Sequence, residues 1–112
     1  MASETQELQD TFQTLYNTLT EAYWVASTLT DKDRIRGSAD AVYDILTTLT
    51  RREIKTRGKA YADLKQPLTT ITARLQKLQA DIDLIIHNVA MASRVTGAIA
   101  KAVTAASSFV AV

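Results

Sequence analysis

The chain of 112 residues contains no cysteine, a single proline and three glycines. Without cysteine it can form neither disulfides nor thiolate metal sites, and a reducing cytoplasm is the expected compartment. So few helix-breaking residues predict long, uninterrupted helices. The polar, acidic N-terminal segment also lacks the basic and apolar regions of a secretory signal, so no signal peptide is expected there.

The chain also lacks an excess of either charge. It has 13 basic and 12 acidic residues and a net charge of +1, whereas a general nucleic-acid-binding protein carries a clear basic excess. His87 is the single histidine, and together with Asp83 it supplies at most two ligands of a metal site. No glycine-rich phosphate loop occurs, and no hydroxyl is paired with a histidine base in a recognisable pattern. We therefore expect no catalytic residues, no cofactor, no metal and no small-molecule substrate.

What the chain does have is a regular spacing of apolar residues, alternating between four and three, as on the buried faces of bundled helices. The first segment carries Leu8, Phe12, Leu15, Leu19, Ala22, Ala26 and Leu29. The second carries Ile35, Ala39, Val42, Leu46 and Leu49. The third carries Leu64, Leu68, Ile71, Leu75, Leu78, Ile82, Ile85, Val89, Ala92, Thr96, Ile99 and Val103.

Capping residues and the single proline divide this pattern into three helices. We expect them at about residues 4–29, 31–65 and 67–107, with Pro67 in the first turn of the last helix. The end of the second helix stays open, because Gly58 and Pro67 both offer stops. The length suits one domain, residues 1–112. The predicted fold class is all-α, an antiparallel three-helix coiled-coil bundle with a long third helix.

The C-terminal half of the third predicted helix is apolar over most of its circumference. Its narrow polar stripe consists of His87, Arg94, Lys101 and Ser108, each seven residues from the next. A helix with so wide an apolar arc must be covered on most sides. Residues beyond Gly97 would project past the other two helices by roughly 15 Å, and an exposed apolar projection usually marks an interface.

The predicted function is therefore non-enzymatic, a helical interaction module that self-associates, binds a protein partner, or does both. The partner would bind the C-terminal part of the third helix, at Ile99, Val103, Phe109 and Val110. Trp24 lies outside the apolar seam of the first helix and could extend this surface, because aromatic anchors dominate binding energy. The simpler interpretation of Trp24 is a ring lying flat against a neighbouring side chain.

A first alternative is a membrane-active protein that lays its third helix on a bilayer. Arg94 and Lys101 share the stripe opposite the apolar face, as in an interfacial amphipathic helix. Residues 95–112 are a poor membrane span, because Lys101 lies near their middle and several Thr and Ser residues accompany it.

A second alternative is an accessory nucleic-acid-binding protein that uses a basic run between residues 51 and 59. The run consists of Arg51, Arg52, Lys55, Arg57 and Lys59. Such a run more often forms a solvated helix face, or at most an electrostatic patch for an acidic partner.

Overall fold

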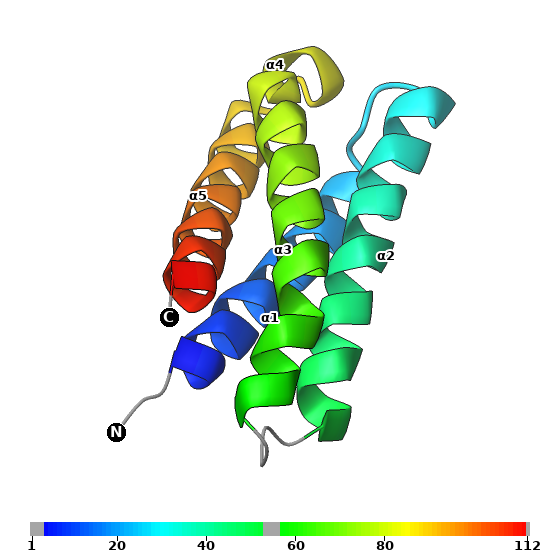
Figure 1. Ribbon diagram of the computed structural model, residues 1–112. Helices are drawn as coiled ribbons and strands as arrows, with labels where there is room; N and C mark the ends of the chain where they lie inside the picture. Colours follow the sequence, from blue (N-terminus) through cyan, green and yellow to red (C-terminus); the bar gives the residue numbers. More distant parts are fainter. Residues whose placement is uncertain (1–3, 53–56, 112) are drawn as a thin grey trace.

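In a computed structural model of the protein, the described residues form five helices (Figure 1). The structure describes the backbone of residues 4–52 and 57–111 and the side chains of residues 6–49 and 64–110. The helices are α1 (Glu4–Tyr23), α2 (Leu29–Arg52), α3 (Arg57–Ala80), α4 (Ile82–Ile85) and α5 (Val89–Ala111). The all-α prediction is confirmed, but the three-helix arrangement is not, because the third predicted helix is divided.

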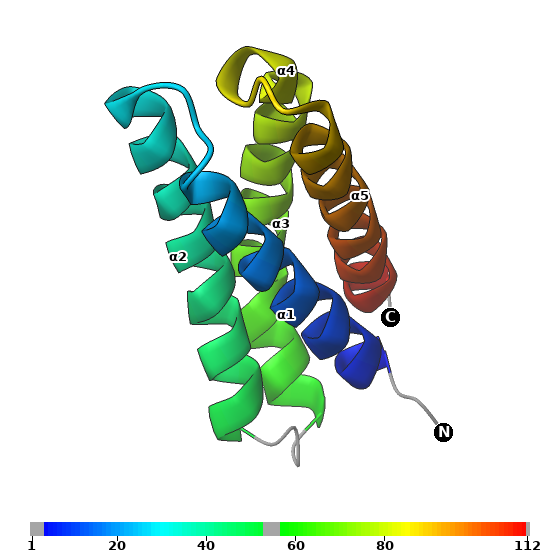
Figure 2. The ribbon, with the colours of Figure 1, turned by 180° about the vertical axis from the view of Figure 1, so that it is seen from behind.

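The four long helices form a bundle in which successive helices run in opposite directions (Figures 1 and 2). Helix α1 packs against α2 and α5, and α3 packs against the same two helices. In Figure 2, α1 lies obliquely across the front of the bundle, with α2 on one side and α5 on the other. Each of the four long helices therefore packs against two others. In the predicted three-helix bundle, the residues of α5 would instead have continued the third helix.

The chain turns back between α3 and α5, within the segment predicted as one continuous helix. After the single turn of α4, Ile86 adopts an extended conformation with φ −121° and ψ 117°. Asn88 then begins α5: its side-chain Oδ1 accepts a hydrogen bond from the Met91 N–H at 2.9 Å. This is an N-cap, which satisfies one of the free N–H groups at a helix start. Because α5 folds back along α1 and α3, the predicted projection beyond Gly97 is wrong.

The cap at Asn88 gives a first testable prediction. Asn88→Ala should lower the free energy of unfolding by about 0.5–2 kcal/mol, because the Met91 N–H loses its acceptor. Asn88→Asp keeps an acceptor oxygen and should stay close to the wild type. Urea unfolding followed by circular dichroism measures both variants. Equal stability of the alanine variant and the wild type would contradict the cap.

The boundary predicted between residues 65 and 67 is also wrong, because α3 runs without interruption through Pro67. A proline inside a helix costs about 3 kcal/mol. On either side of it, Leu64, Leu68, Ile71 and Leu75 are buried in the core, and each such side chain contributes about 1.5–3 kcal/mol. Packing along this face therefore outweighs the local cost of the proline.

The core contains nearly all of the predicted apolar seam positions. Leu29 and Val89 are the clear exceptions, with 72% and 85% of their surface exposed. The wide apolar arc of α5 is covered because α5 contacts both α1 and α3. Its buried residues are Ala92, Val95, Ala98, Ile99, Ala102, Ala105, Ala106 and Phe109. Half of these are more than one helical turn beyond Gly97, so the C-terminal part of α5 belongs to the core.

Among the described side chains, two ion pairs connect parts of the bundle that are distant in sequence. Arg34 on α2 contacts the Asp81 carboxylate at 2.8 Å, just after the end of α3. Arg94 on α5 contacts Glu21 on α1 at 2.7 Å. All four side chains are at least one third exposed, so each pair contributes no more than about 1 kcal/mol. The pairs are consistent with the packing of these helices but do not carry its stability.

Candidate functional site

The five residues predicted to bind a partner do not form one surface. Ile99 and Phe109 are fully buried, so in this fold neither is accessible to a partner. Val103 and Val110 are half-buried against the core. Trp24 is 72% exposed, but it follows the C-terminal end of α1, at the opposite end of the bundle from the C-terminus of α5 (Figure 1). The structure therefore does not unite Trp24 with the C-terminal residues of α5.

Exposed apolar side chains lie instead in or beside the α1–α2 connection and the turn around α4, two segments that meet through backbone contacts. Five of the six large hydrophobic residues that are exposed in the described part of the chain lie in or beside these two segments. They are Trp24, Val25, Leu29, Leu84 and Val89. We call this set the apolar end of the bundle. Figure 1 places both connections at the same end of the molecule.

Backbone pairing holds the two halves of the apolar end together. Ala26 and Ile86 form an isolated antiparallel β-bridge. The backbone N–H and the side-chain hydroxyl of Ser27 both donate hydrogen bonds to the Ile85 carbonyl, each at 3.2 Å. These contacts join segments 58 residues apart. The exposed side chains therefore stand on connected segments of backbone, not on two independent loops.

Trp24 is exposed but held in position by its neighbours. Its ring meets the Tyr23 ring edge to face, with centroids 5.1 Å apart. The Lys32 ammonium lies 5.8 Å from the Trp24 ring centroid and 5.3 Å from that of Tyr23. Such cation–π contacts contribute about 0.5–1 kcal/mol each at an exposed site. The Trp24 ring is thus exposed to solvent, while its contacts with Tyr23 and Lys32 already restrict its side-chain conformation.

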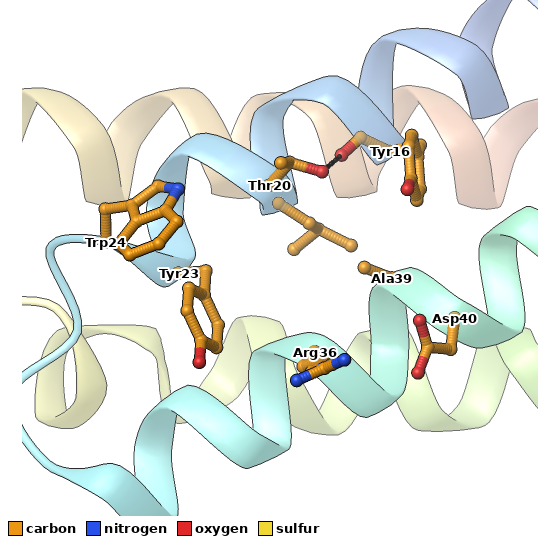
Figure 3. Close-up of a pocket in the computed structure, with 8 residues that line it drawn as sticks. Tyr16, Thr20, Tyr23, Trp24, Arg36, Ala39 and Asp40 are labelled. Atoms are coloured by element: carbon orange, nitrogen blue, oxygen red, sulfur yellow. Dashed lines mark hydrogen bonds between the residues drawn. The ribbon is translucent and has the colours of Figure 1, made fainter.

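Trp24 also forms one end of a groove between α1 and α2 (Figure 3). The groove has a volume of about 350 Å³. Its lining residues are Tyr16, Leu19, Thr20, Tyr23, Trp24, Arg36, Ala39 and Asp40. We call it the aromatic groove. Leu19 and Ala39 are buried members of the core, so the groove has an apolar floor between aromatic and charged walls.

The two ends of the aromatic groove differ in charge. In Figure 3, Arg36 lies between Tyr23 and Asp40, and Asp40 lies on the side of Tyr16. The Tyr16 ring contacts the exposed Tyr43 of α2, with centroids 5.5 Å apart. The groove therefore runs from a basic end near Tyr23 to an acidic end near the pair of tyrosines.

The residues predicted for membrane binding and for nucleic-acid binding do not line the aromatic groove or belong to the apolar end. Arg94 and Lys101 are exposed on α5, but the apolar face of that helix is packed in the core. Within the described residues, no helix has both the length and the apolar character needed to cross a membrane. The side chains of the basic run fall outside the described residues, so its role in nucleic-acid binding stays a prediction. They are those of Arg51, Arg52, Lys55, Arg57 and Lys59.

Titratable side chains do not converge on a reactive centre in the described part of the chain. No group of three histidine, cysteine, aspartate or glutamate residues there is placed to hold a metal ion. His87 is exposed and lines a shallow surface depression with Asp83 and Ser93.

The sequence pattern did not predict the apolar end, because it placed the start of the second helix at residue 31 instead of Leu29 and gave no helix start at Val89. Thr28 caps α2: its hydroxyl accepts a hydrogen bond from the Asp31 N–H at 3.1 Å. Asn88 caps α5 in the same manner. Leu29 and Val89 are the first helical residues after these caps, where the side chain leaves the buried seam. A capping threonine or asparagine directly before each apolar residue was the available signal.

No known protein family, curated protein or solved structure matches the chain.

Proposed function

We propose that this protein is a non-enzymatic helical interaction module that binds a protein partner through its apolar end and the adjoining aromatic groove. The observation that carries the proposal is the exposure of Trp24, Val25, Leu29, Leu84 and Val89 in or beside two connections that pair through their backbones. Single exposed apolar residues are ordinary on a protein surface, but a contiguous patch of them is typical of an interaction site.

The energetics of such a surface favour binding. Fully burying one large apolar side chain contributes about 1.5–3 kcal/mol, so a few of them can offset the cost of association. Trp24 suits the role of anchor, because tryptophan is enriched among the residues that dominate binding energy. The hydrogen bonds of Ser27 to Ile85 already hold the two connections together, which lowers the conformational entropy lost when a partner binds them.

The same surface could bind a second copy of the chain. In that case two apolar ends would cover each other, and the protein would be a homodimer. The proposal therefore includes self-association, and the experiment below separates it from binding of a different protein.

The proposal is tested by site-specific photo-crosslinking of the full chain in the cells that produce it. A photoreactive residue replaces Leu84 or Val89 in the apolar end, and Thr104 on the exposed side of α5 as control. We expect a discrete protein adduct from the first two positions and none from Thr104. An adduct of twice the chain mass identifies self-association. An adduct of another mass identifies a different partner.

The partner is then purified and its affinity measured with the double variant Leu84→Glu, Val89→Glu. Both side chains are more than 70% exposed, so the free energy of unfolding should change by less than about 0.5 kcal/mol per site. Affinity should fall at least about tenfold, because two charges would enter an apolar contact. The absence of any adduct at Leu84 and Val89 above the level at Thr104 would show that the proposal is wrong.

A further inference from the structure

Three of the seven aromatic residues of the chain line the aromatic groove, and together with Tyr43, which contacts Tyr16 but does not line the groove, they form two ring pairs. Tyr16 and Tyr43 form one pair, and Tyr23 and Trp24 form the other. We propose that this groove binds a proline-rich segment of another protein in the polyproline II conformation. This inference rests on the proposed interaction function and specifies the chemistry of the partner at one part of its surface.

The spacing of Tyr16 and Tyr23 along the axis of α1 is close to the repeat of a polyproline II helix. Tyr16 and Tyr23 are seven residues apart on α1, which is close to two turns and a separation along the axis of about 10.5 Å. One turn of polyproline II contains three residues and rises about 9.3 Å. Prolines in a Pro-x-x-Pro pattern would therefore reach both pairs, with the apolar floor of Leu19 and Ala39 between them.

The aromatic lining of the groove suits an extended ligand, because proline-rich segments in the polyproline II conformation bind in aromatic-lined grooves.

The polar atoms around the rings suit the same ligand. A polyproline II helix has no internal hydrogen bonds, so its carbonyl oxygens can accept them from a partner. The Trp24 Nε1–H and the hydroxyls of Tyr16 and Tyr23 are donors. Within the described part of the chain, none of these three groups donates a hydrogen bond to another residue. They can therefore bind ligand carbonyls without breaking an existing contact.

The charged residues around the groove predict which proline-rich sequences bind best. Arg36 and Lys32 lie near Tyr23 and Trp24, whereas Asp40 lies toward Tyr16. Asp44 is one turn beyond Asp40 on α2 and is exposed. The ligand should therefore carry an acidic residue at the end that meets Trp24 and a basic residue at the end that meets Tyr16. It must come from another protein, because this chain has a single proline, inside α3.

The test uses the single tryptophan of the full chain as the reporter. Decaproline peptides with arginine at one end and glutamate at the other, in both orders, are titrated while Trp24 fluorescence is recorded. Peptides with glycine and serine in place of proline are the matched ligands. We expect saturable binding of at least one proline peptide and at least about tenfold weaker binding of its glycine–serine counterpart.

Two protein variants with the same chemical change locate the site. Thr20→Arg places a long charged side chain inside the groove, whereas Thr14→Arg places it on an exposed part of α1 outside the groove. Thr20→Arg should abolish peptide binding, and Thr14→Arg should leave it unchanged. Both variants are first shown by circular dichroism to unfold as the wild type does.

Two results would overturn the inference: equal affinity for the proline and glycine–serine peptides, or unchanged binding by Thr20→Arg. Its failure is distinguishable from failure of the proposed function. If crosslinking at Leu84 and Val89 yields an adduct but no proline peptide binds, the protein binds a partner of different chemistry. If neither occurs, both proposals are wrong.

Discussion

A copy of the chain that ends at Gly97 is expected to lose its cooperative unfolding transition. The deletion removes the C-terminal part of α5, which lies in the core between α1 and α3. The buried residues that would be lost are Ala98, Ile99, Ala102, Ala105, Ala106 and Phe109. Shortening Ile99 and Phe109 to alanine alone would cost about 5–10 kcal/mol together, which is comparable to the whole stability of a small domain.

Thermal unfolding followed by circular dichroism and light scattering checks this result. The truncated chain should show weak, broad melting, and it should associate because the faces of α1 and α3 that α5 covers become exposed. A full-length chain with Thr104→Ala and Ser108→Ala, two exposed positions of the same segment, should melt like the wild type. A folded, monomeric truncated chain would instead support a C-terminal segment that projects from the bundle.

Phe109→Ala is expected to lower the free energy of unfolding by about 3–5 kcal/mol. Phe109 is fully buried and is one of only two phenylalanines, with Phe12 of α1 also fully buried. Its removal would leave a cavity near the end of α5, where alanines on neighbouring turns cannot expand to fill it. Urea unfolding measures the change as a shift of the midpoint at a similar slope.

Ser108→Ala is the matched control, because Ser108 is the preceding residue and is exposed. It should change the free energy of unfolding by less than about 0.5 kcal/mol. If Phe109→Ala were equally mild, the side chain would not lie in the core, and α5 would not pack as described. The two variants together separate the burial of one side chain from any general sensitivity of the C-terminal segment.

Most of the core could be predicted from the spacing of apolar residues. The positions of Leu8, Phe12, Leu15 and Leu19 on one face of α1 follow from the alternation of three and four, and all four are buried. This works because a helix must bury its apolar face whichever neighbour covers it. The all-α class follows from the same local pattern and from the scarcity of proline and glycine.

The apolar end and the aromatic groove could not be predicted in the same way. Leu29 and Val89 continue the seam by spacing, yet the caps at Thr28 and Asn88 leave both exposed. Tyr16 and Tyr43 are 27 residues apart in sequence, and no local rule indicates that their rings meet. The site therefore depends on which helices become neighbours.

The sequence by itself determined that the chain is helical and which faces of its helices are apolar, because both properties depend on residues within a few turns of one another. Only the tertiary structure decided that the chain turns back at Ile86 to Asn88 and that α5 packs in the core. A turn there interrupts helical hydrogen bonding at a modest local cost. It also lets the wide apolar arc of α5 be buried between α1 and α3, and that gain comes from residues distant in the sequence.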